Sequence, residues 1–320
     1  MLALVRTVLV LMWLPLGVAA QDADRMTALR DAYAGWLVRN EVTGTGAFAY
    51  QGAPTTVIGD GSAPVDLASV SKSITALCAA ALSDAGRLDF SASVREVLGR
   101  GPDVSVASLV THTSGIVADI TQPLMVLWLN TEGHRADIVV NLMKEPVGPA
   151  GTYHYNNVNY AVLAMVIEAS SGETYEEVCH RLVLEPAGAR GEASERSGGF
   201  LSWGGWAMSP LDYARVHSHW FGPGNDTGRA PMNYPHVPLG TSGAYYGLGT
   251  VFRENHTGDG TYNFWHFGSL CFPGLFSVGA YAVTWGGEWT AVMGYDGCVD
   301  DDARRDLDAV MGRAAYGPFQ

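Results

Sequence analysis

The stretch that decides the fold is Asp66–Gly86, "DLASVSKSITALCAAALSDAG". Small and apolar residues dominate it from Ser69 onward, which favours a buried helix, and Gly86 suits the position after the last helical turn. Ser69 would start this helix, and Lys72 would lie one turn further along on the same face. The lysine stands out because the chain has only two lysines, at positions 72 and 144, among its 19 basic residues.

Ser69 and Lys72 together suggest nucleophilic catalysis. At the start of a helix the backbone N–H groups point outward, so a serine there can attack a carbonyl while an N–H binds the oxyanion. Lysine suits the base because burial lowers its pKa, whereas arginine keeps its proton in proteins. Ser-x-x-Lys alone is a weak motif, and an exposed helical lysine would explain it equally well.

Composition limits the class of protein. Of the 320 residues, 48% are apolar and 16% are charged, which is typical of a globular chain with a sizeable core. The net charge of −13 argues against nucleic acid and anionic membranes as partners, although solubility alone explains it.

Residues 1–20 predict a secretory signal peptide. Arg6 precedes an apolar run from Val8 to Val18, and small residues follow at Ala19 and Ala20. The run is shorter than the about 20 residues that span a membrane. Cleavage after Ala20 would change the net charge to 18 − 32 = −14. We therefore expect a secreted or periplasmic protein with no stable membrane span, with an uncleaved anchor as the alternative.

The four cysteines allow three full pairings. Cys78 and Cys179 fall in helix-like segments and are expected to be small buried side chains. Cys271 and Cys298 flank two predicted strands and are the better candidates for a disulfide, which an exported protein allows.

The pattern along the chain predicts an α+β fold, an antiparallel sheet flanked by helices with a mostly helical lobe inserted. The sheet lobe would comprise residues 21–60 and 240–320, and the helical lobe residues 61–239. The expected elements are a helix over 22–40, strands over 44–52 and 54–61, helical segments up to 221, a surface loop over 222–243, strand-like runs over 245–297 and a closing helix over 300–317.

Three motifs resemble those of the serine β-lactamase and penicillin-binding protein superfamily. The first is "ASVSKSITALCAAALSDAGRLDFSASVREVL" followed by "LVTHTSGI"; the second is "PAGTYHYNNVNYAVLAMVIEASSG", with Tyr155 and Asn157; the third is "NFWHFGSL", with His266, Phe267 and Gly268. The closest branch holds class C β-lactamases, D-Ala-D-Ala carboxypeptidases, D-aminopeptidases and related esterases. The resemblance covers roughly residues 40 to 300, and "RSGGFLSWGGWAMSPLDYARV" and "YGLG" also look like segments of this superfamily.

The resemblance implies roles for these residues. Tyr155 would be a phenolate-type base whose pKa a neighbouring ammonium lowers, and Asn157 would bind the substrate amide and contact Lys72. The N–H groups of Ser69 and Ser269 would form the oxyanion hole. Gly268 would let the substrate backbone approach closely.

His266 and Phe267 depart from the Lys-Thr-Gly version of the third motif. A neutral histidine followed by a bulky apolar side chain would bind a substrate carboxylate weakly. The expected function is an exported serine hydrolase acting through an acyl-enzyme on an ester or amide, in a small molecule or short peptide. The alternatives are a β-lactamase or D-Ala-D-Ala carboxypeptidase, and a non-catalytic or regulatory relative. No organic cofactor is implied. A metal is not implied either, because His217 and His219 do not share a helical face.

Overall fold

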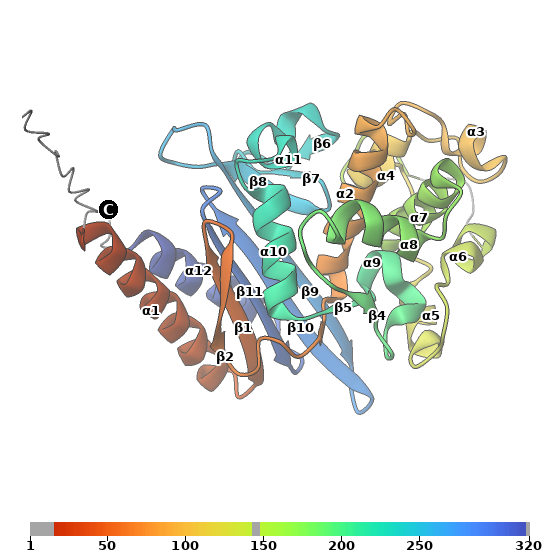
Figure 1. The fold of residues 1–320 in the computed structure, drawn as a ribbon. Helices are drawn as coiled ribbons and strands as arrows, with labels where there is room; N and C mark the ends of the chain where they lie inside the picture. Colours follow the sequence, from red (N-terminus) through yellow and green to blue (C-terminus); the bar gives the residue numbers. More distant parts are fainter. Residues whose placement is uncertain (1–15, 143–147, 318–320) are drawn as a thin grey trace, which may run out of the picture.

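The computed structural model describes residues 16–142 and 148–317, and an eight-stranded antiparallel sheet forms one side of the molecule (Figure 1). The strand order is β2-β1-β11-β10-β9-β8-β7-β6. The expected α+β class is confirmed. The strands are β1 (Thr43–Tyr50), β2 (Ala53–Ile58), β6 (His236–Pro238), β7 (Tyr245–Gly247), β8 (Thr250–Glu254), β9 (Tyr262–Phe272), β10 (Phe276–Trp285) and β11 (Trp289–Asp296).

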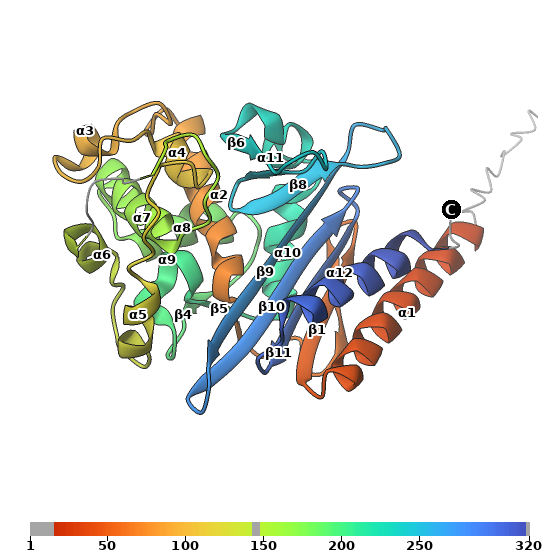
Figure 2. The ribbon, with the colours of Figure 1, turned by 180° about the vertical axis from the view of Figure 1, so that it is seen from behind.

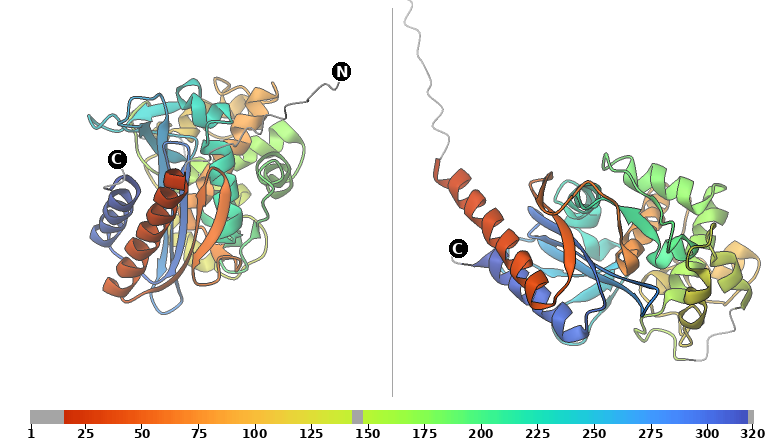
Figure 3. Two further views of the ribbon diagram at one scale, coloured as in Figure 1. Left: turned by 60° about the vertical axis from the view of Figure 1, so that its left-hand side comes forward. Right: turned by 90° about the horizontal axis from the view of Figure 1, so that it is seen from below.

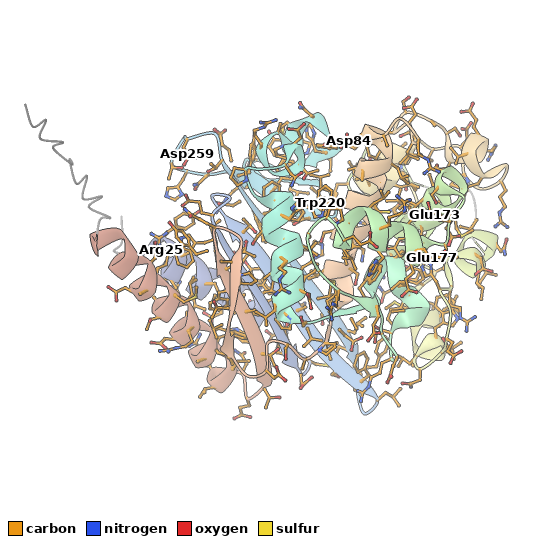
Figure 4. The ribbon with its side chains drawn as sticks, viewed as in Figure 1. Arg25, Asp84, Glu173, Glu177, Trp220 and Asp259 are labelled. Carbon is orange, nitrogen blue, oxygen red and sulfur yellow. A yellow bond between two sulfur atoms is a disulfide. The ribbon has the colours of Figure 1, made fainter. Side chains whose placement is uncertain are left out.

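Two helices from opposite ends of the sequence cover one face of this sheet. They are α1 (Leu16–Arg39) and α12 (Asp301–Tyr316), which lie side by side (Figure 3). Trp36 of α1 is fully buried there, and its indole N–H donates to the Ala303 carbonyl at 2.9 Å. Nearer the start of α1 lies Arg25 (Figure 4), and its guanidinium is 5.3 Å from the centre of the Trp289 ring.

The opposite face of the sheet packs against α10 (Pro210–Phe221). Its N-cap Ser209 accepts a hydrogen bond from the Asp212 N–H, and Pro210 at the first position has no N–H to leave unpaired. Residues 210–221 fall within the stretch expected to form the helical lobe, but α10 covers the sheet (Figure 1). An antiparallel sheet with two apolar faces needs a cover on each.

The helical lobe lies beside the sheet and is joined to it by a small three-stranded sheet of order β3-β5-β4. The longest helix there, α7, is almost entirely buried. The remaining elements are β3 (Val65–Asp66), η1 (Ala68–Val70), α2 (Ser71–Asp84), α3 (Val94–Leu98), α4 (Val106–Val110), α5 (Gln122–Met125), η2 (Val126–Trp128), α6 (Ala136–Leu142), α7 (Asn157–Ser171), α8 (Tyr175–Cys179), η3 (His180–Leu184), β4 (Glu192–Ala193), η4 (Gly198–Phe200), α9 (Leu201–Gly204) and β5 (Trp206–Met208).

Residues 222–243, expected to be a surface loop, contain short regular elements. These are α11 (Asp226–Arg229), η5 (Pro231–Asn233) and strand β6. The Tyr234 hydroxyl donates to the Asp84 carboxylate at 2.9 Å, which ties this segment to the end of α2 (Figure 4). The sequence showed little periodicity here because each element is only three or four residues long.

The strand-like run 245–255 forms a hairpin of β7 and β8. Leu248 and Gly249 have φ values of 54° and 71°, so both central residues adopt the left-handed conformation that a two-residue hairpin turn requires. Gly249 also lies against α2, because a Cβ on it would be 2.3 Å from the Lys72 carbonyl oxygen. The turn therefore packs directly behind the helix that carries Lys72.

Cys271 and Cys298 form a disulfide, with their Cα atoms 5.4 Å apart, and Cys78 and Cys179 are free and buried. The predicted pairing is therefore confirmed. Of the predicted signal peptide, residues 1–15 lie outside the described residues, and α1 begins at Leu16. Across residues 16–142 and 148–317, no helix has the length and apolar character needed to cross a membrane.

Candidate active site

Ser69 lies in the short turn η1, between β3 and α2, and its side chain is partly exposed. The residue before it, Ala68, has a φ of 47°, which residues with a Cβ adopt at a cost of about 1 kcal/mol or more. The Leu67 N–H donates to the Trp206 carbonyl at 2.9 Å and anchors the turn. Ser69 is thus presented by a strained turn before α2.

The turn is held against an open edge of β9. Strand β8 pairs with β9 only from Tyr262 to Trp265, and no other strand of the described ranges pairs with the rest of β9 on that side. A Cβ on Gly268 would lie 2.4 Å from the Leu67 oxygen and 3.0 Å from the Ser69 nitrogen. We expected Gly268 to make room for substrate, but the structure shows that it makes room for the segment carrying Ser69.

Lys72 is fully buried, and its ammonium has three hydrogen-bond acceptors. Its Nζ lies 3.2 Å from the Ser69 Oγ, 2.8 Å from the Asn157 Oδ1 and 2.7 Å from the Trp203 carbonyl oxygen. Burial lowers the pKa of Lys72 to about 7, against the opposing effect of the Asp119 carboxylate. Near neutral pH the amine is therefore partly unprotonated and within reach of Ser69.

Tyr155 lies beside the same two residues but does not have the lowered pKa that we expected. Burial of its hydroxyl raises the pKa well above the ordinary value, although 38% of the residue is exposed and a hydrogen bond with Ser69 acts in the opposite direction. The Lys72 ammonium lies over the ring, 4.9 Å from its centre. Burial raises the pKa more than the hydrogen bond with Ser69 lowers it, so the hydroxyl is protonated at neutral pH.

Asn157 begins α7, and its Oδ1 accepts from Lys72. The N-cap role belongs to its neighbour Asn156, whose side chain accepts from the Val158 N–H at 2.8 Å. The cap leaves the Asn157 side chain free to face Lys72, which is the contact that the resemblance implied.

His266 lies on β9 beside Tyr155, with the two rings 6.1 Å apart. Its Nδ1 is 2.6 Å from the Phe267 carbonyl oxygen, so Nδ1 carries the proton and Nε2 is an acceptor. Burial, followed by the charge of Lys72, lowers the pKa of His266 to about 3. The imidazole is therefore neutral.

The Phe267 side chain does not reach this site. It stacks on Tyr281 at 4.1 Å, within the cluster under α1 and α12, because successive side chains of a strand point to opposite faces. Ser269 lies two residues further along β9, partly exposed and opposite Gly279 of β10. Its N–H remains the predicted second oxyanion donor.

His112 anchors the segment that carries Tyr155 and Asn157, and it was not among the site residues predicted from the sequence. Its Nδ1 accepts from the Asn156 N–H at 3.2 Å and from the Asn159 side-chain amide at 3.1 Å. Its Nε2–H therefore donates to the Tyr246 hydroxyl, at 3.2 Å. Tyr246 in turn bonds to Tyr160, which donates to a backbone carbonyl at 3.0 Å. His112 lies in the quoted stretch "LVTHTSGI", but nothing in its spacing indicated these contacts.

Asp119 was also absent from the residues predicted from the sequence. It is the acidic residue whose charge affects the pKa values of Lys72 and Tyr155. Its carboxylate raises the pKa of both groups and accepts from the Asn157 N–H at 3.2 Å. Within the described ranges, no three His, Cys, Asp or Glu side chains gather closely enough to hold a metal ion. The site is therefore a set of hydroxyl, amine, amide and imidazole groups around Ser69.

This fold and this site define a class, the serine hydrolase superfamily of β-lactamases and penicillin-binding proteins. The family model described as "Beta-lactamase" matches residues 19–296, so the chain belongs to that family. Among curated relatives, Penicillin-binding protein 4* of Bacillus subtilis (strain 168) is 33% identical over 135 residues. That match covers 38% of this chain and 29% of the relative's length.

Solved structures share the fold across most of the chain. A penicillin-binding protein from Bacillus halodurans has a TM-score of 0.69 at 19% identity, covering 89% of this chain and 99% of its own. A D-stereospecific amidohydrolase from Streptomyces sp. has a TM-score of 0.67 at 19% identity, and the match covers 92% of this chain and 98% of that structure's chain. At these identities the likeness shows the fold alone.

Proposed function

We propose that this protein is an exported serine hydrolase that cleaves an ester or amide through an acyl-enzyme on Ser69. The observation that carries the proposal is the buried Lys72 amine, 3.2 Å from the Ser69 Oγ, with its pKa lowered to about 7. A serine hydroxyl needs such a neighbouring base to become a nucleophile.

The steps follow from the protonation of the three groups. The Ser69 Oγ attacks the carbonyl carbon as its proton passes to the neutral Lys72 amine. The N–H groups of Ser69 and Ser269 hold the oxyanion. Tyr155 then gives its proton to the leaving oxygen or nitrogen and recovers one from Lys72. Water, activated by the same pair, attacks the acyl-enzyme and releases the acid.

The charges around the site favour a substrate without a carboxylate. In the part of the chain that the structure describes, the charged groups that shift the pKa values of Lys72, Tyr155 and His266 are Lys72 itself and Asp119. His266 is neutral, with its proton directed at a carbonyl. Asp119 would repel an anionic substrate, and the neutral His266 offers no positive charge to offset it. This supports the esterase or peptidase type over a β-lactamase or D-Ala-D-Ala carboxypeptidase.

Export is the remaining part of the proposal. The leader-like pattern of residues 1–20 supports it, and so does the Cys271–Cys298 disulfide, because disulfides persist in oxidising compartments.

The nucleophile is tested with a fluorophosphonate probe and intact-mass measurement. We expect wild type and Ser83→Ala, a control on the same helix, to gain one adduct, and Ser69→Ala to gain none. An unlabelled wild type would support the non-catalytic alternative, and equal labelling of Ser69→Ala would refute the assignment.

The substrate class is tested with esters that differ only in charge. We expect 4-nitrophenyl butyrate to be hydrolysed at least about tenfold faster, in kcat/KM, than the 4-nitrophenyl monoester of succinate. Faster turnover of a cephalosporin or of a D-Ala-D-Ala peptide than of the neutral ester would contradict this preference.

A further inference from the structure

A groove lies on the outer face of the sheet, away from Ser69. It has a volume of about 650 Å³ and is lined by residues from the last turns of α12 and from strands β8, β9 and β10. Trp265, Val283, Trp285 and Tyr316 form its apolar walls. This volume is within the range of about 300–1,000 Å³ that holds small organic ligands.

The groove exists because the terminal helices cover only part of the sheet. Seen from behind, α12 lies across the sheet, and strands β8 and β9 extend beyond it (Figure 2). The alternation of β9 places Trp265 on this face and His266 on the face toward Lys72. Gly312 of α12 lines the groove, and a Cβ on it would lie in open space with no atom within 4 Å.

Two exposed guanidinium groups border the apolar walls. Arg253 lies over the Trp265 ring, 5.5 Å from its centre, and Arg313 lies in the last helical turn. No carboxylate among the described residues is within ion-pair distance of either, whereas Arg304 and Arg305 of the same helix both pair with aspartates. In a chain of net charge −13, two unpaired arginines at one groove favour a negatively charged ligand.

Three other polar groups of the groove have hydrogen-bond partners. The Asp308 carboxylate accepts from the Tyr281 hydroxyl at 2.5 Å. The Tyr316 hydroxyl donates to the Asn263 side-chain oxygen at 2.8 Å, which also accepts from the Gly286 N–H. The guanidinium groups are therefore the positively charged donors in the lining of the groove, and the indole rings supply the apolar contact.

We propose that this groove binds a small amphipathic carboxylate, an aryl or acyl chain ending in one anionic group. The apolar part lies between Trp265 and Trp285, and the carboxylate bonds to Arg253 and Arg313. This site is separate from the proposed hydrolase site and does not depend on it.

Calorimetric titration of the full chain with 4-phenylbutyrate and its uncharged amide tests the proposal. We expect saturable binding of the acid, about tenfold tighter than the amide and weaker at high salt. Arg253→Gln and Arg313→Gln should each weaken binding of the acid about tenfold and remove most of the preference over the amide. Arg305→Gln, which makes the same charge change on α12, should bind as wild type does.

Gly312→Leu fills the groove and should abolish binding of both compounds, with its folding checked by thermal melting. Binding of the acid that survives Gly312→Leu, or that is unchanged in both arginine variants, would overturn the proposal. Equal affinity for acid and amide in wild type would overturn the assignment of an anion.

Discussion

The lowered pKa of Lys72 gives the reaction a defined pH dependence. A base works only when unprotonated, so kcat/KM for 4-nitrophenyl butyrate should rise with pH, with a midpoint near 7, and level off above it. Lys72→Arg should lose activity by about 10³-fold or more, because arginine stays protonated. A flat profile between pH 5 and 9, or an active arginine variant, would contradict the base role.

Asp119 raises the pKa of Lys72, so removing its charge should move the same profile. Asp119→Asn should shift the midpoint toward lower pH, because the ammonium form loses a stabilising negative charge. Asp137→Asn, an exposed acid on α6, is the matched control and should leave the midpoint in place. A shift toward higher pH in Asp119→Asn would show that the carboxylate acts through structure rather than charge.

Single residues also show where the sequence was informative about the site. The spacing of Ser69 and Lys72 predicted their shared face, and the structure brings Asn157 and His266 to the same place. The pKa of Tyr155 was not predictable, because it depends on how deeply the hydroxyl is buried. Phe267 was misplaced because a three-residue motif on a strand was interpreted without its alternating faces.

Among the elements, η1 and β9 pack closely against each other in the site. Gly268→Ala should destabilise the protein by about 1–3 kcal/mol and lower kcat/KM at least about tenfold, because the new methyl group would displace the Leu67–Ser69 backbone. Denaturant unfolding and ester kinetics measure the two effects.

The control for this prediction is a glycine-to-alanine substitution at a position where the new methyl group contacts no neighbouring atoms. Gly312→Ala adds a methyl group on α12 where nothing lies within 4 Å, and should stabilise the protein by up to about 1 kcal/mol without loss of activity. If Gly268→Ala is equally harmless, the backbone of η1 is not positioned by β9.

Periodicity in the sequence predicted which segments form helices and strands, but it did not predict the turns that connect them. Helices α2, α7, α10 and α12 and strands β9–β11 lie where apolar spacing predicted them. The turn at Leu248–Gly249 was missed because leucine rarely adopts a positive φ, so the run appeared continuous. The positive φ of Ala68 was equally unpredictable, because it depends on tertiary contacts of η1 and not on local sequence.

For the whole molecule, the disulfide connects two distant parts of the sheet lobe. Cys271 ends the strand that carries His266, and Cys298 precedes α12, 27 residues later. Reduction should destabilise the protein by about 3 kcal/mol through loop-closure entropy and lower Tm by about 5–10 °C. The Cys271→Ser/Cys298→Ser double variant should melt at the lower temperature with or without reductant. An unchanged Tm on reduction would show that packing of α12 alone holds this end of the sheet.

The division of the chain into two lobes stays a prediction. The strands of the large sheet lie within residues 43–58 and 236–296, and α10, from the stretch predicted to be helical, packs against that sheet. Sequence periodicity shows that a helix has an apolar face and does not show which surface that face will cover.

The hydrogen bonds that start at His112 also limit how protons leave the active site. Each member donates in one direction, from imidazole to Tyr246, then to Tyr160, and finally to the Val110 carbonyl, which has no proton to pass on. This chain is a dead end for proton transport. We therefore expect protons released during turnover to reach bulk water beside Tyr155, which is 38% exposed, so large acyl groups bound there should slow proton exchange with solvent.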